Sequence, residues 1–402
     1  MKYGMRILQL NTREEIIHEM RRLGADPPGI GLMFPKGLTR MIRLSDVPCP
    51  VANLLKQELL SRGGDCAVAH GTLTHSVETT DVLMVATERH YRGLVRKLKR
   101  QNFFGLPALA DDLALCIRSF NQNRFPCRFG SELIDLGERT YIMGVLNVTP
   151  DSFFDGGAYD SVDAAVIQAI RMAEEGADFI DVGGESTRPG SARVPEEEEL
   201  KRVLPVVERL VREAGLRISV DTCKASVARA ALDAGAHMIN DISGLRFDPE
   251  MASLVAERDV PVVLMHILGT PKDMQQDPSY EDVVGEVLAY LEGSMEIGRA
   301  AGMRDEQMIL DPGIGFGKRL QDNLDLLKHL SEFKVLGRPL LLGTSRKSMI
   351  GAILDLPVAE RMEGSLATAV LGVLNGANLV RVHDVRETAR AVRMADAVMQ
   401  RN

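Results

Sequence analysis

The chain has 402 residues, which is enough for two or three domains, and its 45% hydrophobic and 26% charged residues are ordinary for a globular protein. The net charge of −8 argues against a protein that binds nucleic acid or anionic membranes over a broad surface, and the absence of Trp argues against a stacking surface for single-stranded nucleic acid. We find no apolar run long enough to span a membrane and no secretory signal, so we expect a cytoplasmic protein whose five cysteines are free thiols.

Residues 1–125 predict a smaller α/β domain, to which the sequence assigns no role. Strands are expected at residues 5–10, 41–44, 66–69 and 82–86, and helices at 12–23, 51–60, 88–101 and 108–119. Thr12 and Glu15 have the spacing of a capping box at the first helix. The helix 88–101 is basic, and a solvated helix face explains it better than a binding site. The histidines of this domain lack metal-ligand spacing.

The polar segment 121–128 contains Pro126 and predicts a linker, with the domain boundary near residue 125. Beyond it, residues 126–402 repeat a strand, a polar tip and a helix eight times. The strands are expected at residues 141–148, 179–182, 217–220, 238–242, 261–265, 308–310, 339–342 and 379–382. Apolar strands that alternate with helices indicate a parallel sheet, and eight such pairs fit a closed (β/α)8 TIM barrel. Residues 131–139 are expected to form a small hairpin that plugs the barrel floor.

Almost every expected barrel strand ends in a polar group. These groups are Asn147, Thr187, Asp221, Asn240, His266, Asp311, Lys347 and His383. Each alone has a structural explanation, since an Asp can cap a helix and a His can pack in a core. The C-terminal ends of barrel strands, however, surround one pocket, and buried polar groups need partners. Together these residues therefore predict a binding rim.

The rim divides into two predicted subsites. Asp221, Asn240 and Asp311 suit the amino-pyrimidine edge of a flat heterocycle, because carboxylates accept from N–H groups and an amide both donates and accepts. A cationic set suits phosphate and consists of Arg188, Arg381 and His383, with Lys347 as a further candidate. The side chain of Asn147 is a hard oxygen ligand, compatible with Mg²⁺ held mostly by water and phosphate.

Eight motifs occur in order between residues 141 and 400: MGVLNVTPDSF, DVGGESTRPG, SVDTCK, NDISG, LMH, DPGIGFGK, GTSRKSMIG and RVHDV. In this combination the chain resembles dihydropteroate synthase, a pterin-binding TIM-barrel family. The resemblance implies a transferase of folate biosynthesis, a target of sulfonamides, that joins 6-hydroxymethyl-7,8-dihydropterin pyrophosphate to p-aminobenzoate and releases pyrophosphate. It also implies a Mg²⁺ cofactor and a homodimer. The first 125 residues lie outside the motifs.

The resemblance assigns roles residue by residue. Asn147 would bind Mg²⁺, and the pterin would be held by Thr187, Asp221, Asn240, Asp311 and Lys347. Arg381 would stack on the pterin, and Arg381 and His383 would meet the pyrophosphate. The walls around the aminobenzoate would be Arg188, Pro189, Phe316 and Ser348, with Phe153 and Asp155 in a loop that closes over it. Two positions depart from the family pattern, since Phe154 and Cys223 stand where the family often has Ser.

These roles are mainly positioning and electrostatic. Pyrophosphate is a good leaving group once Mg²⁺ and Arg or His neutralise it, and Asp221 and Asp311 would stabilise an electron-poor pterin ring as the aryl amine attacks. No residue is assigned as a dedicated acid or base. One alternative is a pterin-binding methyltransferase, which would not need Arg188, Lys347, Arg381 and His383 as a pyrophosphate site. Another is a scaffold protein with a degenerate barrel, against which the intact rim argues.

Overall fold

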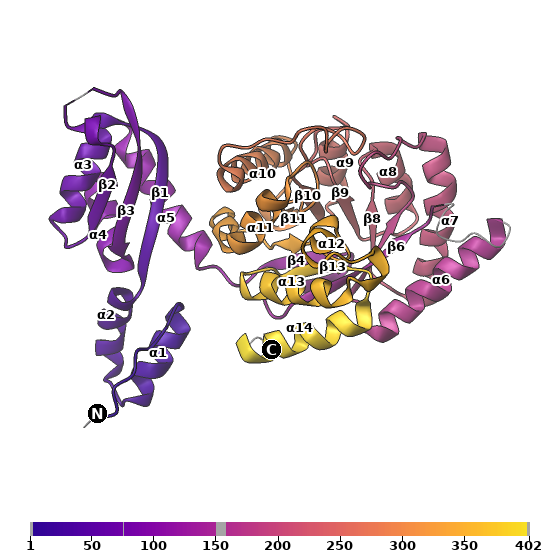
Figure 1. The fold of residues 1–402 in the computed structure, drawn as a ribbon, viewed down its shortest axis with the longest axis horizontal. Helices are drawn as coiled ribbons and strands as arrows, with labels where there is room; N and C mark the ends of the chain where they lie inside the picture. Colours follow the sequence, from indigo (N-terminus) through magenta and orange to yellow (C-terminus); the bar gives the residue numbers. More distant parts are fainter. Residues whose placement is uncertain (1–2, 75, 150–157, 400–402) are drawn as a thin grey trace. The chain divides into compact units, whose positions relative to one another are not determined.

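The computed structural model describes residues 3–74, 76–149 and 158–399 (Figure 1). Its contacts divide the chain into two compact units, Met1–Asn121 and Gln122–Asn402. The division falls within the polar segment expected to be a linker. The two units are described separately below.

The first unit contains a three-stranded antiparallel sheet in the order β1-β3-β2. Its strands are β1 (Thr39–Pro48), β2 (Asp65–Val68) and β3 (Thr79–Thr87), and its helices are α1 (Arg13–Arg22), α2 (Pro27–Gly37), α3 (Cys49–Leu60), α4 (Glu88–Leu98) and α5 (Leu106–Phe120), with a short 3-10 helix η1 (His70–Thr72). The capping box of Thr12 and Glu15 is confirmed, since each side chain accepts from the backbone N–H of the other residue.

The strand expected at residues 5–10 is wrong, because this segment forms no strand and Ile7 is 95% exposed. An apolar run without a neighbouring strand has nothing to pair with. The strands β1, β2 and β3 lie where expected, and α3 and α4 pack on one face of their sheet, where Leu55, Met84 and Tyr91 are buried. Along α4 the cations Arg89 and Arg96 stay exposed, which is the solvated face that the sequence predicted.

The second unit is a TIM barrel, as predicted. Its eight parallel strands are β6 (Tyr141–Asn147), β7 (Phe179–Gly183), β8 (Ile218–Asp221), β9 (Met238–Asp241), β10 (Val262–Met265), β11 (Met308–Asp311), β12 (Leu341–Leu342) and β13 (Leu379–Val382). Adjacent strands pair in the order β11-β10-β9-β8-β7-β6-β13-β12. A parallel bridge between Leu310 and Leu340 joins the first and last strands of this order and closes the barrel.

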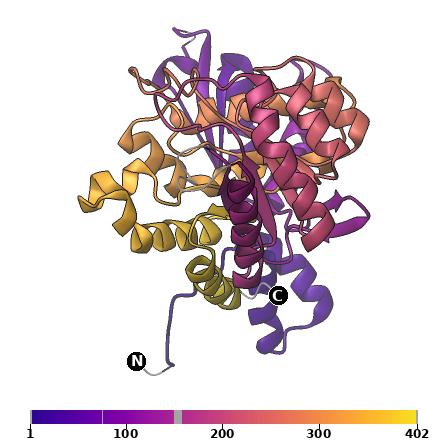
Figure 2. The ribbon, with the colours of Figure 1, turned by 90° about the vertical axis from the view of Figure 1, so that its right-hand side faces the viewer.

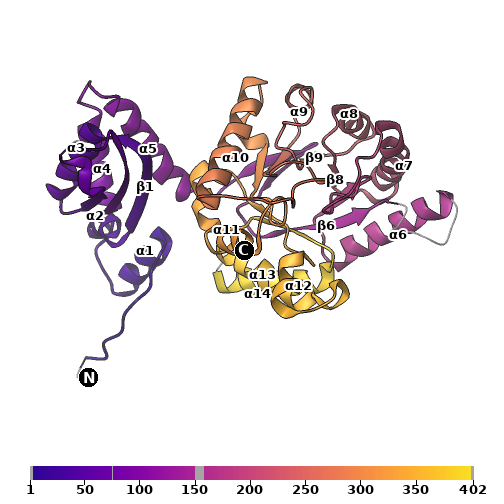
Figure 3. The same ribbon diagram turned by 45° about the horizontal axis from the view of Figure 1, so that its top comes forward.

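Helices surround these strands (Figures 2 and 3). They are α6 (Ala158–Glu175), α7 (Glu196–Ala214), α8 (Ala225–Asp233), α9 (Met251–Arg258), α10 (Val283–Ala300), α11 (Leu320–Lys328), α12 (Ser348–Leu354), α13 (Met362–Leu374) and α14 (Val385–Met399), with 3-10 helices η3 (Asp305–Gln307), η4 (Leu330–Leu336) and η5 (Val358–Glu360). Within the described ranges, no helix combines the length and the apolar character that crossing a membrane requires.

A hairpin of β4 (Pro126–Phe129) and β5 (Glu132–Asp135) precedes the barrel. Its side chains Cys127 and Phe129 pack against strand-start residues such as Phe179 and Leu379, so the hairpin closes the barrel floor as predicted. It starts earlier than expected, inside the segment read as linker, because Phe125 and Cys127 are apolar and buried there. With the floor sealed by apolar side chains, the polar rim lies at the opposite end of the strands.

Candidate active site

The centre of the rim is a half-buried cation paired with two carboxylates. Arg381 on β13 donates from Nε to Asp181 Oδ2 at 2.6 Å and from Nη2 to Asp221 Oδ2 at 2.8 Å. Asp181 lies in the middle of β7 and is fully buried, and Asp221 ends β8. Asn240 on β9 donates to the same Asp181 oxygen at 2.9 Å. Asp181 thus links two predicted pterin-binding residues, Arg381 and Asn240, which come from distant parts of the chain.

Two carboxylates of the rim have altered acidity. Burial raises the pKa of Asp221 to about 7, although the neighbouring Arg381 opposes the change. Burial also raises the pKa of Asp311, while the charges of Lys347, Lys318 and Arg381 act in the opposite direction. Asp311 is held in place at the end of β11, where its Oδ1 accepts from the N–H of Gly313 at 2.7 Å. Because burial makes ionisation of these carboxyl groups unfavourable in the free protein, they favour a ligand whose N–H groups donate to them.

The loops after β11 and β12 bring a second pair of predicted residues together. Lys347, which precedes α12, donates to the carbonyl of Ile314, and its Nζ lies 4.7 Å from the centre of the Phe316 ring. Burial lowers the pKa of Lys347 to about 8. Ser348, the first residue of α12, is exposed. The structure therefore brings Lys347 and Phe316 together at the rim.

Lys318 holds this loop in shape. Its Nζ lies within 3.0 Å of three acceptors, which are Nδ1 of His266 and the carbonyls of Gly313 and Phe316. The sequence places His266 on the rim, but the ring is buried against Tyr290 and accepts from Lys318, so His266 supports the loop. Burial lowers the pKa of His266 to about 2, which keeps the ring neutral as an acceptor.

His383 follows β13 and faces Ser345. The Ser345 hydroxyl accepts from the His383 backbone N–H at 3.1 Å and lies 3.0 Å from Nδ1 of the ring. Desolvation, and then the charges of Arg381 and Arg346, lower the pKa of His383 to about 4. The ring is therefore neutral near pH 7 in the free protein. Beside it, Arg346 donates to both carboxylate oxygens of Asp384, at 2.9 and 2.5 Å.

The loop after β7 contains Thr187, which is half-buried, and Arg188 and Pro189, which are exposed. Beneath this loop Lys224 donates to Glu185 at 2.5 Å and to the buried Glu199 on α7. This ion-pair cluster fixes the loop start. The loop also reaches the segment after β10, since the N–H of Gly190 donates to the carbonyl of Pro271 at 2.9 Å.

Asn147 ends β6 beside Gly183, which is the paired position on β7. A Cβ at Gly183 would lie 3.8 Å from Asn147 Oδ1 and 3.5 Å from the Asp221 side chain, so the glycine keeps the space between these two groups open. The predicted closing-loop residues Phe153 and Asp155, and the departure at Phe154, lie outside the described residues.

Comparison with known proteins agrees with this geometry. Residues 143–383 match the family of pterin-binding enzymes. The dihydropteroate synthase of Bacillus subtilis is 51% identical over 264 residues, which are 66% of this chain and 90% of that protein. A crystal structure of Yersinia pestis dihydropteroate synthase with a sulfonamide drug complex is 46% identical, has a TM-score of 0.65, and covers 68% of this chain and 99% of its own. The chain belongs to the dihydropteroate synthase family. It is therefore a transferase, as its motifs indicated.

The first unit also has a relative. A probable bifunctional folylpolyglutamate synthase/dihydropteroate synthase of Halobacterium salinarum is 45% identical over 381 residues, covering 94% of this chain and 45% of that protein. Because this match extends over nearly the whole chain, it includes most of the unit before residue 122. The α/β unit is thus shared with at least one other member of the family.

Sequence reasoning missed several residues that organise the synthase site. Asp181 is the foremost, and its signal was a carboxylate in the middle of the apolar strand β7, at an alternate position that faces the barrel interior. Lys318 and Lys224 lie inside two of the motifs, but the sequence assigns them no role. Each is a buried lysine with several hydrogen-bond partners. Arg346 and Asp384 form an ion pair that only the fold could reveal, because 38 residues separate them.

Proposed function

We propose that the synthase binds the pterin ring of 6-hydroxymethyl-7,8-dihydropterin pyrophosphate at the rim of Asp221, Asn240, Asp311 and Lys347, and joins it to p-aminobenzoate. The observation that carries the proposal is the convergence of these side chains around Arg381 at one end of a sealed barrel. The two aspartates would accept from the ring N–H groups, and Asn240 can both donate and accept. Thr187 would contact the pterin from the β7 loop.

The reaction breaks the bond between the pterin methylene carbon and the pyrophosphate oxygen, and forms a bond from that carbon to the amine nitrogen. The pyrophosphate leaves with the electron pair, and the amine loses its proton to solvent. The flat guanidinium of Arg381, fixed by Asp181 and Asp221, is suited to stack on the ring while its remaining N–H groups face the leaving group. Neutral His383 would donate a hydrogen bond to the pyrophosphate, with Arg188 nearby as a full charge.

Mg²⁺ is the proposed cofactor, and Asn147 would supply one of its oxygen ligands. Among the described residues there is no group of three His, Cys, Asp or Glu side chains that could hold a metal ion without the substrate. The donor set fits an ion held mostly by phosphate oxygens and water, as Mg²⁺ commonly is. When bound, the ion would neutralise charge on the leaving pyrophosphate.

The aminobenzoate would enter between Arg188, Pro189, Phe316 and Ser348, which the β7, β11 and β12 loops carry. The contact of Lys347 with the Phe316 ring supports a position of this wall beside the proposed pterin end. Sulfonamides are proposed to compete for the same position, as analogues of the aryl amine.

A homodimer is proposed through the outer surface of α13 and α14. The sequence of α13 is apolar around most of its circumference, and it leaves Leu371 and Leu374 exposed. On the neighbouring α14, Met394 and Val398 are also exposed, the latter at 73%. Exposed apolar side chains on neighbouring helices are typical of an interface.

A cytoplasmic location is proposed as well, because the five cysteines are free thiols and a reducing compartment keeps thiols free.

The test of the proposed function is a pyrophosphate-release assay with the two substrates. We expect pyrophosphate and dihydropteroate in equal amounts, dependence on Mg²⁺, and strong loss of turnover in Asp221→Asn. Pterin-dependent methyl transfer without pyrophosphate release would refute the proposal. Loss of Asp221 without any change in turnover would refute the role given to the rim.

A further inference from the structure

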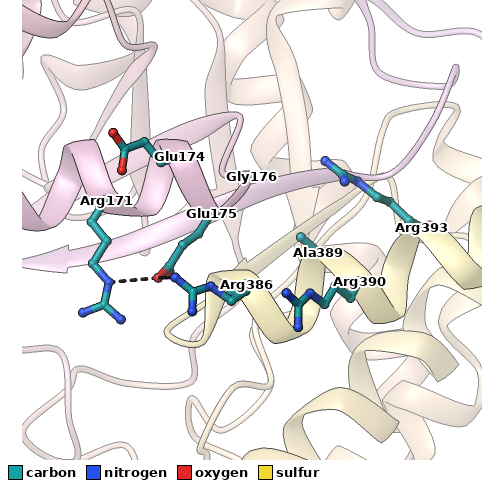
Figure 4. A pocket seen from close by; sticks show the side chains of 8 residues that line it. All are labelled: Arg171, Glu174, Glu175, Gly176, Arg386, Ala389, Arg390 and Arg393. Atoms are coloured by element: carbon teal, nitrogen blue, oxygen red, sulfur yellow. Dashed lines mark hydrogen bonds and ion pairs between the residues drawn. The ribbon is translucent and has the colours of Figure 1, made fainter.

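A second polar hollow lies between α6 and α14, apart from the strand-end rim (Figure 4). It has a volume of about 290 Å³ and is lined by eight residues, of which four are arginines. Arg171 comes from α6, and Arg386, Arg390 and Arg393 come from α14. The three α14 arginines recur at the spacing that places them on one helix face. We call this hollow the arginine groove.

The charges in the arginine groove are not balanced. Glu175 accepts from Arg171 at 2.9 Å and from Arg386 at 3.0 Å, so one carboxylate serves two guanidinium groups. Neither Arg390 nor Arg393 forms an ion pair with any residue that the structure describes. Four cations therefore face two carboxylates, Glu174 and Glu175, on a chain whose net charge is −8. Neighbouring like charges on one helix face are unfavourable by themselves, and an anion between them removes that cost.

The groove adjoins the leaving-group end of the site. A neighbouring hollow of about 320 Å³ shares Arg171, Glu175 and Arg386 with it, and its wall also includes His383 and Arg346. This neighbouring hollow, whose wall also contains Asp384 and Glu387, thus connects the arginine groove to the strand end that carries His383. The apolar surface proposed for dimer contact borders the groove, because Met394 lies one helical turn after Arg390 on α14.

We infer that the arginine groove is a second binding site for pyrophosphate, occupied after this product leaves the rim. The inference rests on the proposed function. Guanidinium groups bind phosphate oxygens through paired N–H groups, and the groove presents them from two helices, which suits a compact anion with two phosphates. A bound pyrophosphate would compete with Glu175 for Arg171 and Arg386, and Arg390 and Arg393 would supply the unopposed charge.

The experiment measures binding of inorganic pyrophosphate to the full chain by isothermal titration calorimetry without Mg²⁺. We expect two sites in the wild type. In an Arg390→Gln/Arg393→Gln variant, the second site should weaken at least tenfold. The matched control is Arg89→Gln/Arg100→Gln, which removes the same charge from exposed positions on α4 and in the turn just after it, and should retain both sites. Initial rates of dihydropteroate formation should stay within twofold of wild type in both variants.

A wild-type chain that binds a single pyrophosphate would overturn the inference. So would an Arg390→Gln/Arg393→Gln variant that keeps both sites, or a control that loses one equally. Failure of the proposed function has a different signature, since the two substrates would then release no pyrophosphate from any variant. The binding stoichiometry would still report whether the groove holds the anion.

Discussion

Replacing Asp181 by Asn tests whether this unassigned carboxylate positions the pterin site. Its Oδ2 atom accepts from Arg381 Nε at 2.6 Å and from Asn240 Nδ2 at 2.9 Å, and the side chain is fully buried. A hydrogen bond to a charged group contributes about 1.5–3 kcal/mol. If that energy is lost from the orientation of Arg381, pterin affinity should fall about 10- to 150-fold, because each 1.4 kcal/mol is a factor of ten.

The assay is calorimetric titration of 6-hydroxymethylpterin into the wild type and Asp181→Asn, after thermal unfolding has shown that the variant folds. Ser219→Ala is the matched control. Ser219 lies on β8 at the position that pairs with Asp181 of β7, and its buried hydroxyl has no hydrogen-bond partner among the described residues. Removing that hydroxyl breaks no hydrogen bond and should leave affinity within about twofold. Asp181→Asn with wild-type affinity, or a loss that Ser219→Ala reproduces, would refute the positioning role.

Three further outcomes follow from the same geometry. Pterin affinity should rise as pH increases through about 7, where Asp221 becomes a carboxylate, and should fall above about 8, where Lys347 loses its charge. The affinity is measured by calorimetric titration from pH 5.5 to 9.5, and a flat profile would contradict the pterin-binding roles of Asp221 and Lys347. Gly313→Ala should lower kcat/KM more than tenfold, since the residue has φ 67° and a Cβ there would lie 1.9 Å from the His266 carbonyl oxygen; steady-state kinetics that match wild type would exclude this constraint. Asn147→Ala should raise severalfold the Mg²⁺ concentration that gives the half-maximal rate. Calorimetric binding of 6-hydroxymethylpterin, which has no phosphate, should stay unchanged. A Mg²⁺ dependence equal to that of the wild type would exclude Asn147 as the ligand.

The barrel was predictable because its signal is periodic and local. Apolar strands such as β6 and β13 are followed by polar tips and amphipathic helices, and a parallel sheet places all those tips at one end. The rim residues Asp221, Asn240 and Asp311 can therefore be grouped from the sequence alone. The motifs then supplied the substrate class.

Other features depended on contacts between distant segments. His266 looks like its neighbours on the rim, but only the fold shows Lys318 and Tyr290 against its ring. The charge of His383 could not be read from its type, because desolvation and two arginines lower its pKa. The failed strand at residues 5–10 shows the same limit, since an apolar run becomes a strand only where another strand is available to pair.

The most direct test of the central claim is a crystal structure of the chain with 6-hydroxymethyl-7,8-dihydropterin pyrophosphate bound. We predict the ring at the C-terminal ends of the barrel strands, with its N–H groups on Asp221 and Asp311 and its diphosphate toward Arg381 and His383. A pterin ring bound outside the barrel mouth, or one that leaves both carboxylates without contact, would contradict the account.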